Sequence, residues 1–494
     1  MYLEHVYLPE FHRHKSIDTI KAHVFDASCN YDIILGRDIL SHFQIDIQYS
    51  DNTITWEDQD IAMKPHDFFA NHVNTASCLI DFMDIEDEEH ESFLKEILPS
   101  KYGKVDTNMV AEQQKHLDET KQNDLKQLLS KFPTLFNGEL GQYTKKKIHL
   151  TMEEGSVPFH AKAYPVPIVH HKIFYEELQR LVAVGVLERC GQSEWASPTF
   201  IIPKKDGRVR WVSDFRKVNK KLKRRIYPIP KIQDILSRRK GYKFFTKIDI
   251  SMQYHTFELD DESKELCTIV TPFGKYRYKR LPMGIKESPD IAQEIMETTL
   301  NDLREFLEIY IDDIGVFSNS WEEHVSHLQQ TLSRLEQAGF TVNPLKCEWA
   351  TQETDWLGYW LTPNGLKPWN KKVKAILAIK PPKNKKQLRS FIGAITFYRN
   401  MWPHRSHILA PLTAMTGNNT SFKWKEIHQK AFDQIKAIIS KSTLLLYPNH
   451  NLPFDIYTDA SDFQLGGAIF QNGKPVAFFS KKLSKAQMNY TTTE

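Results

Sequence analysis

Cysteine is scarce in this sequence, and its few cysteines stand far apart. The five cysteines form no C-x-x-C pair, which argues against a zinc ribbon, a zinc knuckle or a disulfide framework and fits a reducing compartment. Long apolar runs are missing as well. Nowhere do eighteen apolar residues follow one another, and the first residues lack the apolar centre of a signal peptide. We therefore expect an intracellular, cytoplasmic protein without a transmembrane segment.

Acidic residues are absent from one long stretch of the chain. Between residues 356 and 425 there is no Asp or Glu, but there are thirteen Lys or Arg. Residues 203–240 hold fifteen Lys or Arg against three Asp, a local balance of +12, although the net charge is only +3. One such run alone is most simply a solvated face. Two runs on either side of apolar strands that contain paired acids favour a polyanionic partner.

Turn signals and apolar periodicity divide the first part of the chain. Residues 1–65 have the pattern of short strands (YDIILG, QIDIQYS, TITW). Residues 66–140 contain an acidic run and look like a linker with short helices. A helical period then runs from Ile173 to Gly185, and SPTFIIPKKDGRVRWVSDF reads as two strands joined by a basic turn.

The central part alternates between strands and helices. KFFTKIDISMQYHTFEL and EIYIDDIGVF are each predicted as one strand, and Ser288-Pro289 predicts the start of a helix that continues to Phe306. An amphipathic helix is expected from Trp321 to Gly339. Its His324 and His327 lie one turn apart without a Cys or carboxylate cluster, so we expect structural roles for them. The order of elements predicts an α+β sheet packed on helices.

Three aspartates stand in these apolar strands. Asp312 and Asp313 are adjacent, and Asp249 precedes Asp312 by 63 positions, with a helix between them. Two neighbouring antiparallel strands would bring the three carboxylates together, where they would repel one another unless a cation lay among them. Asp oxygens suit Mg²⁺, and two such ions support in-line phosphoryl transfer. We therefore expect a metal-dependent phosphoryl-transfer site.

Several blocks of sequence resemble a known family. KIDISMQY, LPMGIKESPDIAQ, YIDDI, the segment from HLQQTL to NPLKCEW, and LGYWLTPNG follow one another as do the blocks of a reverse transcriptase. FIGAITFYRNMWPH, APLTAMT and DIYTDAS resemble the downstream part of the Pol polyproteins of gypsy-like long-terminal-repeat retrotransposons. The resemblance covers roughly residues 140–494. It implies a multidomain α+β protein with a right-hand polymerase: fingers and palm in 141–360, thumb and connection in 361–446, and the start of a ribonuclease H-like α/β domain in 447–494.

The resemblance also implies the residues of the metal site. The family's catalytic carboxylates fall on Asp249, Asp312 and Asp313, and the backbone carbonyl of Ile250 takes the position of a fourth ligand. We expect Asp249 and Asp312 to bind both Mg²⁺ ions (Mn²⁺ is an alternative). Asp313 is expected to be more peripheral, because adjacent side chains on a strand point to opposite faces.

Further positions match the family's substrate-binding residues. In this sequence the residues implied for dNTP binding are Lys204, Arg210, Tyr254, Met283 and Gly284. Lys204 and Arg210 match the residues that grip the triphosphate, and Tyr254 matches the aromatic that excludes a ribose 2′-OH. Met283 and Gly284 match the pocket floor. Residues 356–359 (Trp356, Leu357, Gly358 and Tyr359) match the hairpin that holds the primer terminus.

Two positions depart from the family's pattern, and both ends of the chain look incomplete. Gln253 stands where many relatives have Gly, and Glu287 places an acid where relatives carry a neutral residue. Asp459 and Glu494 resemble the first two carboxylates of a ribonuclease H, whose remaining acids would lie downstream. Residues 1–65 resemble the C-terminal part of a retropepsin-like protease, but DAS at 26–28 lies too close to ILG to be its catalytic triplet. We expect no protease activity.

The function predicted from the sequence is that of an RNA-directed DNA polymerase. Its partners would be an RNA template, a DNA primer, the RNA/DNA hybrid and dNTPs, and by family resemblance it would act in a virus-like particle. A catalytically decayed nucleic-acid-binding remnant is an alternative. A DNA-templated polymerase shares the same metal chemistry and is separated from the first reading only by template competition.

Overall fold

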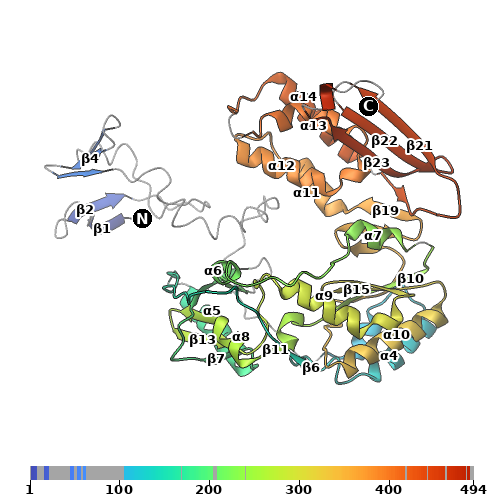
Figure 1. Ribbon diagram of the computed structural model, residues 1–494, viewed down its shortest axis with the longest axis horizontal. Coiled ribbons are helices and arrows are strands. Elements are labelled where there is room, and N and C mark those ends of the chain that lie inside the picture. Colours follow the sequence, from blue (N-terminus) through green and yellow to red (C-terminus); the bar gives the residue numbers. More distant parts are fainter. Residues whose placement is uncertain are drawn as a thin grey trace. The chain divides into compact units, whose positions relative to one another are not determined.

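The computed structural model describes two parts of the chain. Before residue 63 it describes five strands, and from 105 to 489 it describes all residues except 168–169, 204–208, 240, 418–419, 442, 462–463 and 485–486 (Figure 1). The chain divides into two compact units, residues 1–86 and 87–494. Each is described by itself.

The strands of the first unit form two small antiparallel sheets. Strand β1 (Tyr2–Tyr7) pairs with β2 (Ser16–Lys21), and β3 (Ile45–Gln48), β4 (Thr53–Trp56) and β5 (Gln59–Ala62) follow one another as a meander. The strands predicted from QIDIQYS and TITW are confirmed as β3 and β4. The expected strand YDIILG and the DAS triplet lie outside the described residues.

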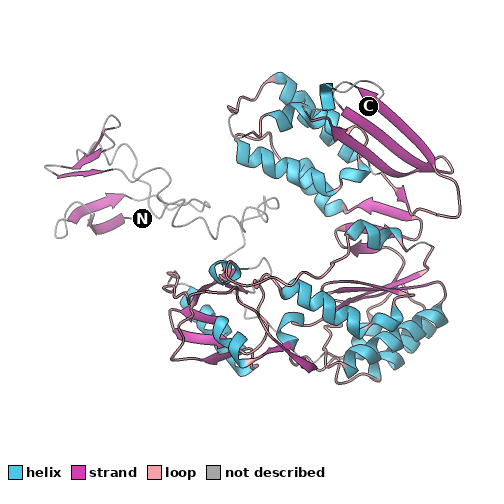
Figure 2. Ribbon diagram, viewed as in Figure 1, coloured by secondary structure: helices cyan, strands magenta, loops and turns pink. Residues whose placement is uncertain are grey.

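A four-stranded sheet forms the centre of the second unit. Its order is β14 (Leu307–Tyr310), β15 (Asp313–Ser318), β10 (Phe244–Asp249) and β16 (Glu348–Thr351). Helices α9 (Ser288–Thr299) and α10 (Trp321–Gln337) pack on it (Figure 2). Ser320 caps the N-terminus of α10, since its side chain accepts from the Glu323 N–H, and the helix ends before Gly339, as its periodicity predicts.

A second sheet shares one hydrophobic core with the central sheet. Its order is β7 (Leu187–Arg189), β13 (Gly274–Tyr278), β12 (Thr268–Thr271), β8 (Ser197–Pro203) and β9 (Val209–Ser213). β8 and β9 pair antiparallel and confirm the two expected strands, while residues 204–208 of the basic turn between them lie outside the described residues. Helix α5 (His171–Ala183) confirms the predicted helix and packs beside β7.

Several shorter elements complete this part of the unit. They are α3 (Thr107–Glu112), α4 (Glu119–Ser130), β6 (Tyr143–Ile148), α6 (Arg216–Asn219), α7 (Ile232–Ser237), the 3-10 helix η2 (Gln253–Thr256), β11 (Phe257–Leu259), α8 (Asp261–Leu266) and η3 (Asn301–Leu303). Strands β6 and β11 pair in parallel. Leu125, Leu128 and Leu129 of α4 are buried in the same core cluster as Ile248 of β10, so this part of the segment expected as a linker with short helices (66–140) packs on the domain that follows.

The C-terminal elements form a second hydrophobic core. Strands β17 (Thr354–Trp356), β18 (Tyr359–Thr362), β19 (Gly365–Pro368) and β20 (Leu445–Leu446) make one sheet. Helices α11 (Asn370–Ala378), α12 (Lys385–Phe397), α13 (Arg405–Ala414) and α14 (Glu426–Ser440), with η4 (Arg399–Met401), contribute about half of the buried side chains of this core. Strands β21 (Asp455–Ser461), β22 (Gln464–Gln471) and β23 (Lys474–Lys482) form an antiparallel sheet, followed by η5 (Gln487–Asn489).

The strand expected from KFFTKIDISMQYHTFEL and the helix expected from Ser288 differ from the structure. The single strand expected from KFFTKIDISMQYHTFEL is wrong: β10 stops at Asp249, Met252 has a left-handed φ of +49°, and a 3-10 turn precedes β11. The helix expected to reach Phe306 ends at Thr299, with Glu287 as its N-cap and Ser288 as its first residue. In both places the apolar pattern continues across a break that only the backbone geometry reveals.

Candidate active site

The adjacent aspartates lie at a hairpin turn and not inside a strand. Tyr310 and Asp313 are register partners, so Ile311 and Asp312 form the two-residue loop between β14 and β15. The prediction of one continuous strand through EIYIDDIGVF is therefore wrong. Asp312 is exposed at the loop and Asp313 begins β15. The turn thus exposes Asp312, whereas Asp313 stays partly buried at the start of β15.

The neighbouring strand brings the third aspartate to the same place. Asp249 is the last residue of β10 and the register partner of Asp313, as the sequence reasoning expected of two antiparallel strands. Its backbone is held on both sides: its N–H donates to Cys347 Sγ at 3.4 Å, and its carbonyl accepts from the Asn343 N–H at 3.2 Å. Ile250 forms a bridge with Val342. The end of β10 is thus fixed by residues 342–347.

Charge repulsion and burial act on this carboxylate cluster. Burial raises the pKa of Asp249, and the charge of Asp312 raises it further. Lys346, whose Nζ lies 3.7 Å from Asp249 Oδ1, acts in the opposite direction and lowers this pKa. Burial and then the charge of Asp312 raise the pKa of Asp313 to about 6. Anionic groups in such a setting are stabilised by a cation. Lys346 was not anticipated from the sequence, because only the fold brings it beside Asp249.

The donor set fits a hard divalent cation that takes its other ligands from a substrate. Among the described residues no three His, Cys, Asp or Glu side chains converge on one point that could hold a metal ion. Mg²⁺ in phosphoryl-transfer sites is bound by one or two carboxylates together with substrate phosphates and water. Asp249 and Asp313, with Asp312 beside them, supply such a partial set of oxygen ligands.

Tyr254 lies close to this cluster. It belongs to η2, directly after the break in β10, and burial followed by the charge of Asp312 raises its pKa to about 12. Met283 is half exposed, and the carbonyl of Gly284 accepts from Asn219 Nδ2 at 2.7 Å. Arg210 is exposed on β9. Lys204 lies outside the described residues.

The residues matched to the primer hairpin lie in the second core, where Trp356 packs on side chains of the central sheet. Trp356 is buried, with its ring 5.5 Å from that of Phe245 and 5.7 Å from that of Phe317. The Tyr398 hydroxyl donates to the Gly358 carbonyl at 2.6 Å and accepts from the Trp369 N–H at 3.2 Å. Tyr398 therefore fastens the hairpin loop to α12, a role that the sequence did not reveal.

Other predicted residues take separate positions. The side chain of Glu287 is buried (1% exposed), its Oε1 has no hydrogen-bond partner among the described residues, and burial raises its pKa. Asp459 is exposed on β21 opposite Gly466, while Glu494 lies outside the described residues. His324 bonds to Thr246 and Ser318, in agreement with the expected structural role.

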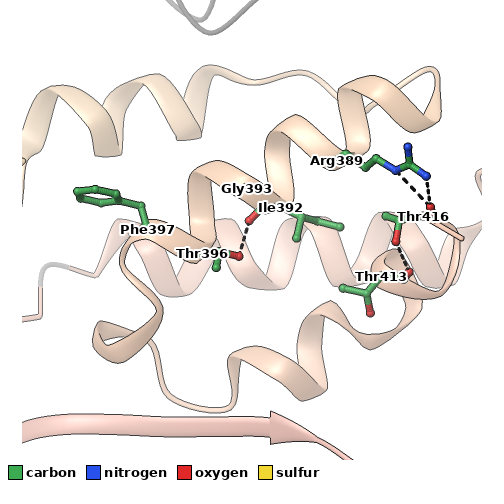
Figure 3. Close-up of a pocket in the computed structure, with 7 residues that line it drawn as sticks. All are labelled: Arg389, Ile392, Gly393, Thr396, Phe397, Thr413 and Thr416. Atoms are coloured by element: carbon green, nitrogen blue, oxygen red, sulfur yellow. Dashed lines mark hydrogen bonds between the residues drawn. The ribbon is translucent and has the colours of Figure 1, made fainter. Parts of the chain in front are cut away.

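A cavity of about 460 Å³ lies between α12 and α13, away from the carboxylates (Figure 3). Its lining residues are Arg389, Ile392, Gly393, Thr396, Phe397, Thr413 and Thr416. The Arg389 guanidinium donates to the Thr416 carbonyl. No residue predicted for catalysis or dNTP binding lines this cavity.

Comparison with protein families identifies two domains. Residues 202–361 match the family described as reverse transcriptase (RNA-dependent DNA polymerase). Residues 424–494 match the RNase H-like domain found in reverse transcriptase. The first match contains all three aspartates and the second contains Asp459. The chain thus carries a reverse transcriptase domain followed by an RNase H-like domain, and the resemblance predicted from the sequence is confirmed.

Curated relatives are polyproteins of transposons. The chain is 29% identical over 504 residues to the retrovirus-related Pol polyprotein from transposon 297 of Drosophila melanogaster, a match that covers 99% of this chain and 46% of the relative. It is 30% identical over 354 residues to the transposon Tf2-3 polyprotein of Schizosaccharomyces pombe, covering 70% of this chain and 26% of the relative. The chain therefore spans less than half the length of these relatives.

Solved structures confirm the predicted fold. The foamy viral protease-reverse transcriptase in complex with double-stranded DNA has a TM-score of 0.72 at 22% identity, covering 81% of this chain and 72% of that chain. The same viral protein in complex with an RNA/DNA hybrid has a TM-score of 0.70 at 22% identity, covering 78% and 53%. Within the described residues, no helix is both long and apolar enough to cross a membrane.

Proposed function

We propose that this chain, with its reverse transcriptase and RNase H-like domains, is the RNA-directed DNA polymerase part of a retrotransposon Pol polyprotein. It would add deoxynucleotides from dNTPs to the 3′ end of a DNA primer paired with an RNA template. The observation that carries the proposal is the pairing of Asp249 with Asp313, with Asp312 on the adjoining turn, inside the matched reverse transcriptase domain.

The carboxylates and the Ile250 carbonyl would hold two Mg²⁺ ions together with the substrate phosphates. When bound, these ions supply charge neutralisation for the attacking and leaving oxygens. Asp249 and Asp312 are the proposed ligands of both ions, and Asp313 is the proposed peripheral carboxylate. The protein's own part is positioning: β10 and the β14–β15 turn hold the oxygens, and Lys346 offsets the charge of Asp249. Positioning of this kind provides most of the rate in phosphoryl transfer.

The substrates would be selected by the residues around the cluster. Arg210 and Lys204 would bind the triphosphate, and Met283 and Gly284 would form the pocket floor. The ring of Tyr254, which lies near Asp312, would clash with a ribose 2′-OH. Because a copying enzyme accepts any sequence, we expect the RNA/DNA hybrid to be held through its backbone, with residues 356–359 at the primer terminus and the basic stretch 356–425 along the duplex.

Two further assignments concern the RNase H-like domain and the location of the protein. For the RNase H-like domain we propose Asp459 and Glu494 as metal ligands. We assign no activity to this domain, since Glu494 lies outside the described residues. We also propose a cytoplasmic location, supported by the described cysteines Cys190, Cys267 and Cys347, which are free and buried.

Primer extension tests the polymerase. The wild type should extend a DNA primer on an RNA template with Mg²⁺, whereas Asp312→Asn should lose roughly a hundredfold or more of the rate. Asp261→Asn is the matched control, because Asp261 is exposed in the first turn of α8. Equal rates for wild type and Asp312→Asn would contradict the assignment. Salt-sensitive hybrid binding without incorporation would favour the decayed remnant, and a faster rate on DNA templates would favour a DNA-templated polymerase.

A further inference from the structure

The loop that carries Asp312 contains an isoleucine in an unfavourable backbone conformation. Ile311 has a φ of +55°. Positive φ values in two-residue hairpin loops are normally occupied by Gly, Asn or Asp, and a β-branched residue there is an outlier. Such conformations persist where the surrounding structure holds them. The hydrogen bonds of the Ile311 peptide therefore explain how this conformation is maintained.

Two buried glutamines bind both polar groups of Ile311. Gln293 Oε1, on α9, accepts from the Ile311 N–H at 2.6 Å, and Gln253 Nε2, on η2, donates to the Ile311 carbonyl at 2.9 Å. Their exposed fractions are 0% and 3%. The Gln293 amide is itself oriented, since its Nε2 donates to the Ile309 carbonyl at 3.2 Å and to Glu297 Oε1 at 2.8 Å. Buried hydrogen bonds of this kind fix a conformation closely.

Gln253 links the two strand ends that carry the aspartates. It lies four residues after Asp249 and directly before Tyr254, in the segment where β10 is interrupted. Its other amide atom, Oε1, is buried without a hydrogen-bond partner among the described residues. Since an unpartnered buried acceptor is unfavourable, this glutamine is explained better by its bond to Ile311 than by a contribution to the core.

We propose that Gln253, together with Gln293, is a positioning residue that holds the Ile311 peptide in its left-handed conformation and thereby fixes Asp312 relative to Asp249. By the resemblance, many relatives carry Gly at the position of Gln253, and a glycine has no side chain that could make this bond. The proposal rests on the proposed polymerase function for its kinetic test, and a second test does not depend on that function.

The first test measures the loop itself in the protein without nucleic acid or metal. Gln253→Met conserves the side-chain volume, removes the donor to the Ile311 carbonyl and also removes the unpartnered Oε1 of Gln253. Hydrogen exchange followed by mass spectrometry should show amides of residues 308–313 exchanging about fivefold faster, the equivalent of one lost hydrogen bond. Gln330→Met, on the exposed side of α10, is the control and should leave this exchange unchanged. Unchanged exchange in Gln253→Met overturns the proposal.

The second test measures single-turnover incorporation of one dNTP. Gln253→Met should lower the maximal rate by about tenfold or more, as loss of a supporting contact does at metal sites, with the dNTP Kd and the hybrid Kd unchanged. Ile311→Gly should restore much of the rate in the Gln253→Met background, because glycine adopts this φ without strain. A loss that Ile311→Gly does not rescue, accompanied by a lower thermal midpoint, means a structural role and overturns the proposal. If the wild type incorporates nothing, the polymerase function fails, while the exchange test still decides the role of Gln253.

Discussion

Two glycines with the same backbone conformation should differ sharply in their tolerance of alanine. Gly185 follows α5 and Gly339 follows α10, and both have a φ of +81°. The hydrogen bonds around them match: the residue after each glycine donates to the carbonyl five residues before it. A Cβ on Gly185 would meet no atom within 4 Å, whereas a Cβ on Gly339 would lie 2.0 Å from the Gln142 carbonyl oxygen.

The two costs follow from these surroundings. Gly185→Ala should lose about 1 kcal/mol of unfolding free energy, the cost of a left-handed L-residue. Gly339→Ala bears the same cost and must also displace Gln142, whose N–H donates to the Gly339 carbonyl at 2.7 Å. Overpacking adds about 1–3 kcal/mol, so the total loss should be about 2–4 kcal/mol. The disturbance would also reach Asp249, whose carbonyl is held by the nearby Asn343.

Urea denaturation of the wild type and both variants, followed by tryptophan fluorescence, gives the two differences in unfolding free energy. The loss for Gly339→Ala minus the loss for Gly185→Ala tests the close approach at Gly339, since the cost of the left-handed backbone is common to both variants. Equal losses for Gly185→Ala and Gly339→Ala would refute the reasoning.

Further predictions concern selectivity, pH dependence and the primer hairpin. Tyr254→Ala should raise ribonucleotide incorporation relative to deoxynucleotide incorporation by about tenfold or more; an unchanged ratio in a competition assay would remove Tyr254 from this role. Burial lowers the pKa of His324 to about 3, so the stability it contributes is complete above its unfolded pKa near 6.5 and is lost toward about 3 as the pH falls. The unfolding free energies from urea denaturation at pH 6.5 and 5.5 should differ by about 1 kcal/mol more in the wild type than in His324→Gln. Tyr398→Phe removes the hydrogen bonds to Gly358 and Trp369, each worth about 1 kcal/mol. It should shorten the DNA products of primer extension when a trap captures enzyme that leaves the primer. Products of wild-type length would show that the contact of Tyr398 with the hairpin does not support extension.

Some of the fold could be predicted because local signals and tertiary packing agree. Helix α10 has an apolar period, a Ser320 cap and a terminal Gly339, and the structure ends it where the sequence suggests. The pairing of Asp249 with the adjacent aspartates also followed from strand order and chemistry. For α10 the signal lies in residues a few positions apart. For the aspartates it lies in the residue type, because few other structural settings explain carboxylates in apolar strands.

The breaks at the candidate site could not be predicted for a physical reason. The apolar residues of EIYIDDIGVF continue on both sides of the turn, and Ile311 is a poor residue for a left-handed φ, so the two aspartates alone did not mark the turn. The conformation depends on Gln253 and Gln293, which are 58 and 18 positions away. Contacts of this separation cannot be read from a local pattern, and the same applies to Lys346 beside Asp249.

The most direct measurement of the central claim compares chemistry with binding in one variant. Asp249→Asn should bind an RNA/DNA primer–template hybrid with the wild-type Kd, but should lose roughly a hundredfold or more of the single-turnover rate of dNTP incorporation. The exposed Asp261→Asn control should match the wild type in both. Wild-type incorporation by Asp249→Asn would contradict the assignment of the paired aspartates as the polymerase site.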